Sequence, residues 1–356
     1  MFVETVVLAC IDRFQGERTV NAIYYLLAGK MSAQTIQDVA WFELHPYFNL
    51  FPDLRKSEFA ETLLFLHKQK WITMDRQIAW LTDQGEKIYR EEVQRYPLPA
   101  NFNGYQFHKI DEKFWSRLSL IVQIFSHWAH DETGFISVER DPETQRMVKK
   151  WLFVLGKTRS RHELITDCYE ELSRLLQMVN HKGLNPNLLV YRLSGYRKSG
   201  LTFRQLADRL HIDETYIRVL FRSVLHGMIL LIRKYPKQFP LFSSFVRDLQ
   251  QPLKLTRSTA RTYDLLKAGK SVTEIARLRQ LKPSTIQDHV VEIALMDPDF
   301  SIDPFVSPPL QEKIRIALQN TRSRKLRQIK EYVPEADYFS IRLVLASRFK
   351  PSEKNK

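Results

Sequence analysis

The sequence predicts a mainly α-helical, multidomain protein, and three observations support this fold class. Apolar residues recur at helical spacing through most of the 356 residues, whereas only 71–82 shows the shorter period of strands. Two breaks rich in proline, 96–104 and 296–310, divide the chain. Hydrophobic residues make up 44% and charged residues 26%, the composition of a folded protein. The expected domains are 1–95, 105–250 and 251–356.

Residues 1–95 show the element order of a winged-helix-like domain. Helices are expected over 17–30, ending at Gly29, over 32–42, capped by Ser32, and over 57–71, starting at Ser57. Two strand-like stretches, 71–73 and 78–82, then flank a turn predicted at Met74-Asp75, and a helical pattern resumes. Three helices followed by a short β-hairpin is the order of a winged helix. A helical domain with a chance hairpin is the alternative.

The first residues and the cysteines indicate the compartment. Asp12 directly follows the short N-terminal apolar stretch, and no basic residue precedes it, so we expect a core element and not a signal peptide. No apolar run approaches the roughly 20 residues that span a bilayer. Cys10 and Cys168 are the only cysteines and form no CxxC motif. A reduced, cytoplasmic location is therefore expected, with nucleoid association left open.

Residues 105–250 are predicted to form a helical domain that begins with a bundle. Apolar-rich helical patterns cover 114–130, 144–155 and 161–179. His127 and His130 lie three positions apart, a spacing that two metal ligands on a helix can have. Because no third ligand lies nearby in the sequence, we interpret both as core or surface residues and expect no metal site.

A repeat links the second and third domains. Residues 198–225 align with 267–294 at an offset of 69 positions, without a gap. Each copy has a glycine, expected to end one helix in the left-handed region, and two positions later a hydroxyl residue, expected to cap the next helix. These are Gly200 and Thr202 in the first copy, and Gly269 and Ser271 in the second.

An alanine in each copy predicts that two helices cross closely. Ala207 and Ala276 stand where a larger side chain would keep the helices apart, and branched apolar residues after the turn bury the second helix against the first. This is the helix-turn-helix pattern, present twice in the same register. His211 and Gln280 stand where the turn often has glycine.

The second copy carries the candidate DNA-binding residues. Ile286, Val290 and Ile293 form the inward stripe of its second helix, so the polar residues at the start of that helix are expected to face outward. Hydroxyls can reach phosphates, glutamine can pair with adenine, and basic side chains can contact the backbone. Asp288 also faces outward in this pattern, although phosphates would repel it. The candidates are Arg257, Arg261, Arg277, Arg279, Lys282, Ser284, Thr285 and Gln287.

The first copy is a weaker candidate for nucleic-acid contact. Its outward residues are expected to be Glu214, Thr215, Tyr216, Arg218 and Arg222. Glu214 complements the helix dipole at the start of the second helix, but a carboxylate there opposes phosphate binding. A packing module is therefore the alternative for this copy, as a protein-binding surface is for the second.

Charge supports a nucleic-acid partner for the C-terminal part. The formal net charge is +14, and 251–356 holds 20 Lys and Arg against 12 Asp and Glu, a net of +8. A basic domain that also carries a groove-fitting helix is better support than either feature alone.

From Thr256 onward the chain resembles the helix-turn-helix domain found at the C-terminal end of some RecQ-type DNA helicases. The segment TRSTARTYDLLKAGKSVTEIARLRQLKPSTIQDHVVEIAL carries G-x-S-x-x-E-I-A-x-x-R followed by S-T-I-x-x-H, and KIRIALQNTRSRKLRQIKEYVPEADYFSIRLVLA continues the likeness. The whole chain is similar to the YpbB-like bacterial proteins, stand-alone relatives of this domain whose genes tend to neighbour a RecQ-family helicase. The core EIA…T…H run is also shared with response-regulator effector domains.

The resemblance implies an accessory role, through DNA binding, helicase association or both, in DNA replication, recombination or repair. It transfers no catalytic residues, and no G-x-x-x-x-G-K-[ST], HExxH or GxSxG motif occurs, so we expect no enzyme, no cofactor and no small-molecule substrate. The expected partners are DNA and a RecQ-type helicase, with no membrane. A sequence-specific transcription regulator and a purely protein-binding adaptor are the alternatives.

Overall fold

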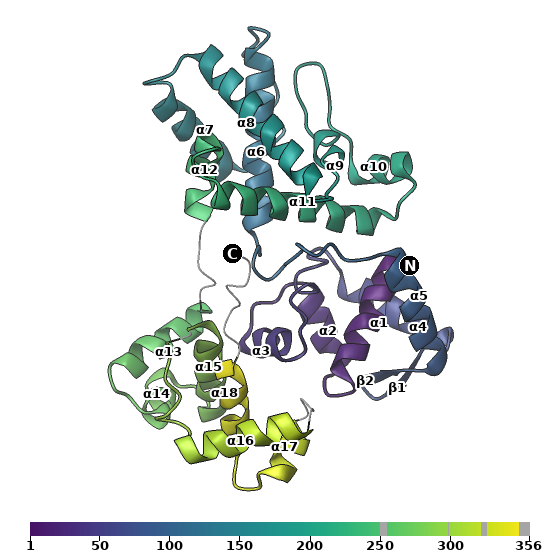
Figure 1. Ribbon diagram of the computed structural model, residues 1–356, viewed down its shortest axis with the longest axis vertical. Helices are drawn as coiled ribbons and strands as arrows, with labels where there is room; N and C mark the ends of the chain where they lie inside the picture. The colour runs from purple at the N-terminus through teal and green to yellow at the C-terminus, as the bar shows by residue number, and fades with distance from the viewer. Residues whose placement is uncertain (250–254, 298, 322–325, 349–356) are drawn as a thin grey trace. The chain divides into compact units, whose positions relative to one another are not determined.

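The computed structural model describes residues 1–249, 255–297, 299–321 and 326–348, and it is mainly α-helical (Figure 1). This confirms the predicted fold class. Internal contacts divide the chain into two compact units. Unit 1 comprises Met1–Thr5 and Arg90–Gln251, and unit 2 comprises Val6–Tyr89 and Pro252–Lys356. The three domains expected from the sequence stay a prediction.

The N-terminal segment of unit 2 contains helices and a β-hairpin. The elements here, the first and last of which extend into unit 1, are α1 (Phe2–Phe14), α2 (Val20–Leu27), α3 (Ala33–Trp41), α4 (Lys56–Lys68), β1 (Ile72–Asp75), β2 (Ile78–Leu81) and α5 (Asp83–Arg95). α1 is a core element, as expected, with Val7 and Cys10 fully buried. Ser32 caps α3 by accepting a hydrogen bond from the Thr35 amide at 3.3 Å. α4 begins one residue before Ser57, at Lys56.

The hairpin differs from the prediction in the place of its turn. Met74 and Asp75 belong to β1, which pairs antiparallel with β2, so that Asp75 lies opposite Ile78. The chain reverses at Arg76, which has a φ of 53°, and at Gln77. Helices followed by a hairpin agree with the winged-helix order, and the winged-helix assignment stays a prediction.

Unit 1 is built around α11. Its helices are α6 (Ile110–Trp128), α7 (Pro142–Leu155), α8 (Arg161–His181), α9 (Asn187–Val190), α10 (Phe203–Leu210), α11 (Glu214–Lys234), α12 (Pro240–Val246) and the 3-10 helix η1 (Arg247–Leu249). α6, α7 and α8 confirm the three helical patterns of the expected bundle. α11 contacts α6, α8, α9, α10 and α12 and buries residues along its whole length.

α11 is also long and apolar enough, by length and composition, to cross a membrane, with a mean hydropathy of 1.5 over its most apolar window. No long apolar run is apparent in the sequence of α11, because Arg218, Arg222 and His226 interrupt its apolar residues. The structure buries 72% of that window. α11 therefore has the burial of a core helix.

A buried polar network holds the first turn of α6, and the segment before it, against α11. Asp111 accepts a hydrogen bond from Arg222 Nε at 2.7 Å, and its Oδ2 lies 3.1 Å from His226 Nε2. The Asn103 amide donates to His226 Nδ1 at 3.3 Å, which assigns the ring proton to Nε2 and makes the ring a donor to Asp111. Phe107 stacks on the imidazole with ring centroids 4.3 Å apart. The network therefore requires a neutral His226.

We expect the stability of unit 1 to fall as the pH drops below about 6.5, the ordinary pKa of histidine. Burial lowers the pKa of His226, although the bond to Asp111 opposes this, while the nearby Arg222 charge lowers it further. Below 6.5 the unfolded chain therefore binds the proton first, and stability decreases with a slope of at most about 1.4 kcal/mol per pH unit. Above that pH the contribution of His226 to the stability of unit 1 does not change with pH. Urea midpoints between pH 5 and 8 measure the slope.

His226→Gln is the matched variant for this pH dependence, because an amide can donate to Asp111 and accept from Asn103 without titrating. Its stability should vary less with pH over the same range, whatever its absolute value. An identical slope in the parent and in His226→Gln would assign the pH dependence to another group.

The C-terminal segment of unit 2 is helical throughout its described residues. Its helices are α13 (Arg257–Lys267), α14 (Val272–Arg279), α15 (Pro283–Met296), α16 (Pro308–Thr321), α17 (Leu326–Tyr332) and α18 (Tyr338–Arg348). α15 contacts α13, α14 and α18, and it also contacts α3 from the N-terminal segment (Figure 1). The core of unit 2 therefore includes helices from both segments of the chain.

Candidate nucleic-acid interface

Both copies of the repeat fold as a helix, a turn and a second helix, α10 with α11 and α14 with α15. Each first helix opens with a capping box, in which Thr202 accepts from the Gln205 amide and Ser271 from the Glu274 amide. The two alanines of the crossings are 7% and 4% exposed. The turn residues that replace glycine, His211 and Gln280, share the left-handed conformation, with φ of 54° and 53°. The helix-turn-helix prediction is confirmed for both copies.

The two glycines before the caps, Gly200 and Gly269, have different structural roles. Gly269 follows α13 with a φ of +78°, as predicted. Gly200 does not have a positive φ, so the expectation that it ends a helix in the left-handed region is wrong. A Cβ at Gly200 would lie 2.0 Å from the carbonyl oxygen of Arg192. Gly200 is therefore required by the close approach of two backbone segments.

The second helix of the C-terminal copy, α15, is open to solvent only at its start. Ile286, Val290 and Ile293 are fully buried, as the inward stripe predicts. Its opposite side is also buried, because α3 and α18 pack there, and from His289 to Leu295 every residue of α15 is buried. The exposed residues are Lys282, Pro283 and Ser284, followed by the half-buried Thr285, Gln287 and Asp288.

Asp288 is neutralised inside unit 2. It forms an ion pair with Arg342 of α18. Arg342 also donates from Nη2 to Gln37 Oε1 of α3 at 2.7 Å, and Gln37, which is fully buried, lies with its amide 3.5 Å from the Asp288 carbonyl oxygen. In the sequence pattern Asp288 lies where phosphates would repel it. In the structure its carboxylate is instead neutralised by Arg342 of the same unit.

The Arg279 side chain forms hydrogen bonds within unit 2 and does not face outward toward a partner. It donates to the carbonyl oxygen and to Oγ of Ser258, both at 2.9 Å, and to the Thr262 hydroxyl. Burial and the nearby Arg261 charge lower its pKa. Its guanidinium therefore ties the end of α14 to α13, and the expectation that this side chain lies free outside the packed face is wrong.

Four other predicted basic residues remain exposed on α13, on α14 and at the start of α15. Arg257 and Arg261 are one helical turn apart on α13, Arg277 lies in the last turn of α14, and Lys282 is the N-cap residue of α15. Within the described part of the chain, none of these four side chains has a hydrogen bond or an ion pair. They are therefore available to an anionic partner.

The first copy has few free side chains. Tyr216 is only 8% exposed, because its hydroxyl donates to the Pro97 carbonyl oxygen at 2.7 Å and its ring packs on Phe2. Arg222 belongs to the Asp111 network. The predicted outward orientation is wrong for both residues. Arg218 pairs with Glu214 at 2.7 Å, and Thr215 is half-buried. The structure favours the packing interpretation of this copy.

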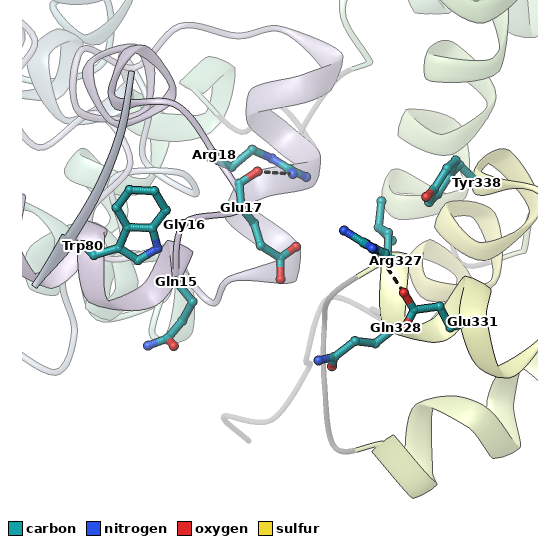
Figure 2. Close-up of a pocket in the computed structure, with 10 residues that line it drawn as sticks. Gln15, Gly16, Glu17, Arg18, Trp80, Arg327, Gln328, Glu331 and Tyr338 are labelled. Carbon is teal, nitrogen blue, oxygen red and sulfur yellow. Dashed lines mark hydrogen bonds and ion pairs between the residues drawn. The ribbon is translucent and has the colours of Figure 1, made fainter. Parts of the chain in front are cut away.

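Unit 2 also contains a pocket of about 690 Å³ that the sequence analysis missed (Figure 2). The Trp80 indole lies over Gly16, where a Cβ would be 2.3 Å from Nε1, and Tyr338 and Arg327 line the pocket from α18 and α17. Its arginines are already paired, Arg18 with Asp38 at 2.7 Å and Arg327 with Glu331 at 3.0 Å. In the sequence, only Trp80 in the predicted hairpin could have indicated this pocket. Because both of its arginines are already paired, the pocket has little free positive charge to bind an anion.

Comparisons with known proteins agree with the helix-turn-helix geometry. Residues 258–345 match the family described as a helix-turn-helix domain, which begins in α13 and ends in α18. The chain is 31% identical over 355 residues to Protein YpbB of Bacillus subtilis (strain 168), covering 98% of this chain and 97% of that protein. No solved structure matches the chain. With this identity over nearly all of both chains, the protein belongs to the YpbB family.

Proposed function

We propose that this protein is a non-catalytic, cytoplasmic accessory protein that binds DNA through α13, α14 and the first turn of α15. In this proposal it acts with a RecQ-type helicase in DNA replication, recombination or repair. The helicase part is supported by the resemblance of the residues from Thr256 onward to the C-terminal domain of such helicases. The DNA part is supported by the surface of unit 2.

The observation that carries the DNA proposal is that the first turn of α15 is exposed to solvent, together with basic side chains that have no ion pair among the described residues. A helix-turn-helix contacts bases with the N-terminal residues of its second helix, the part that α15 leaves uncovered. The positive end of the helix dipole and the exposed Lys282 and Ser284 there favour phosphate. Arg277, Arg257 and Arg261 extend the positive surface over α14 and α13. Because the rest of α15 is covered, we expect a shallow contact dominated by the phosphate backbone.

Charge reversal at two of the free cations, Arg277→Glu with Lys282→Glu, should weaken DNA binding about tenfold or more at low salt. Each lost phosphate contact removes one released counterion, and each new carboxylate adds repulsion. Fluorescence anisotropy with labelled single-stranded and double-stranded DNA, over a salt series, measures the affinity and its salt slope, which should also become shallower.

Lys182→Glu with Lys234→Glu is the matched control, since it makes the same change of net charge at exposed lysines of unit 1. It should leave most of the affinity in place. Failure of the parent protein to bind either form of DNA, or equal losses in both double variants, would count against the proposed surface. Recovery of a helicase by a protein without DNA affinity would favour the adaptor alternative, and one preferred palindromic site would favour a transcription regulator.

A further inference from the structure

Unit 1 has an apolar groove that the described residues leave open. It has a volume of about 910 Å³ and lies among α6, α7, the start of α8 and the loop between α6 and α7. We name it the α7 groove. Its apolar lining includes Leu120, Ile124, Trp128, Val148, Leu152 and Phe153. Phe153 is 68% exposed, so a large apolar side chain stands in water at the edge of the groove.

The loop wall of the α7 groove is held in place by a buried side chain. Gln123 of α6, only 7% exposed, donates from Nε2 to the Ile136 carbonyl oxygen at 3.0 Å and accepts from the Val138 amide at 2.8 Å. These two bonds fix the loop on both sides of Ser137, which lines the groove. The groove is therefore bounded by a tethered segment and is largely pre-formed, as binding sites usually are.

The charged residues that line the α7 groove have one sign. Its charged lining residues are Lys149, Arg159 and Arg161, and no acidic residue lines it. Arg159 is paired with Asp167 at 2.8 Å, whereas Lys149 and Arg161 have no ion pair within the described residues. Arg161 is also the first residue of α8, whose N-terminus is capped by Ser160 and Glu163. Lys149 and Arg161 thus flank the apolar floor without an ion-pair partner among the described residues.

The aromatic rings of the α7 groove favour a protein partner over a nucleic acid. Arg161 lies over the Trp128 ring at 5.1 Å, Lys157 lies over the Phe153 ring at 5.0 Å, and His127 stacks on Phe135 at 4.4 Å. Each ring therefore already has a partner on one face. Single-stranded nucleic acids bind through successive bases stacked on aromatic faces, and each of these rings keeps at most one face for that, whereas the aliphatic floor suits apolar side chains.

We propose that the α7 groove binds an acidic amphipathic segment of another protein. Two or three aliphatic or aromatic side chains of that segment occupy the floor, and its carboxylates face Lys149 and Arg161. This is the helix-in-groove mode of recognition, with charge complementarity selecting the partner. The inference stands apart from DNA binding, because the groove lies wholly in unit 1 and the DNA surface in unit 2.

Selection of random peptides of about four helical turns against the intact protein tests the chemistry without assuming a sequence. We expect the enriched peptides to carry apolar residues at i, i+3, i+4 and i+7 with Asp and Glu between them. A synthetic peptide of this consensus should bind in fluorescence anisotropy, and Lys149→Glu with Arg161→Glu should weaken it about tenfold or more. Phe153→Ser should weaken it as well.

Lys150→Glu with Lys182→Glu is the control, since both lysines are exposed and neither lines the groove. It should change peptide affinity little. Enrichment of basic or uncharged peptides, no enrichment, or binding that the groove variants leave unchanged would overturn the proposal. Loss of single-stranded DNA binding in the groove variants would assign the groove to nucleic acid instead. DNA binding by unit 2 can fail or succeed independently of these results.

Discussion

Asp111→Ala should destabilise unit 1 by about 3–5 kcal/mol, the largest effect that we expect of a single substitution. Asp111 is fully buried and is the shared acceptor for Arg222, whose side chain is 11% exposed, and for His226, which is fully buried. Burial alone would raise the pKa of Asp111, but the hydrogen bond to His226 and the Arg222 charge outweigh it and lower the pKa to about 2. Removing the carboxylate leaves a nearly buried guanidinium without its counter-charge.

Asp208→Ala provides the control for this prediction, because Asp208 is exposed on α10 of the same unit. It should shift stability by no more than about 0.5 kcal/mol. Urea unfolding followed by circular dichroism measures both variants at neutral pH. If Asp111→Ala also lowered the free energy of unfolding by no more than about 0.5 kcal/mol, the network would contribute little to stability. The neutral state of His226 would then need another explanation.

Glu292→Ala should destabilise unit 2 by about 2–3 kcal/mol, because it leaves several buried donors without an acceptor. Glu292 lies on α15 and is fully buried, and it accepts hydrogen bonds from the Thr256 amide at 2.6 Å and the Thr259 hydroxyl at 2.6 Å. It therefore caps the N-terminus of α13 from a neighbouring helix. Burial raises its pKa, although these hydrogen bonds oppose the shift.

Glu292→Gln should be milder than Glu292→Ala, since its amide oxygen can still accept and hydroxyl groups can turn to accept from its nitrogen. Glu312→Ala is the control, with a side chain that is 61% exposed in an ion pair with Arg315. Thermal unfolding ranks the three variants. Equal losses in Glu292→Ala and Glu312→Ala would contradict the capping role. Because α13 carries Arg257 and Arg261, Glu292→Ala should also weaken DNA binding at temperatures where unit 2 is still folded.

The sequence predicted the parts of the fold that depend on neighbouring residues. The helix caps at Thr202 and Ser271, the buried Ala276 and the helical periods all involve residues within a few positions of each other, so propensity and spacing reveal them. The hairpin was recognised but its turn was misplaced. Arg76 takes the left-handed conformation there, and arginine is not a residue whose presence indicates positive φ.

The candidate interface was only partly predictable, because long-range contacts decide which side chains are free. Helical spacing placed Arg279 and Arg277 together outside the inward stripe, yet Arg279 reaches Ser258, 21 positions away, and Arg277 does not. Likewise Arg222 was expected to face outward from α11 but meets Asp111, 111 positions away. No periodicity encodes such pairings, since each depends on which other helix packs alongside.

The packing of α3 on α15 has a consequence for how the chain is made. Gln37 and Arg342, which meet beside α15, are 305 positions apart. During translation α3 therefore leaves the ribosome long before α15 and α18 are made, and nearly all of unit 1 is completed in between. Folding of unit 2 must wait for the last helices, so nascent chains should depend on chaperones more than their size suggests.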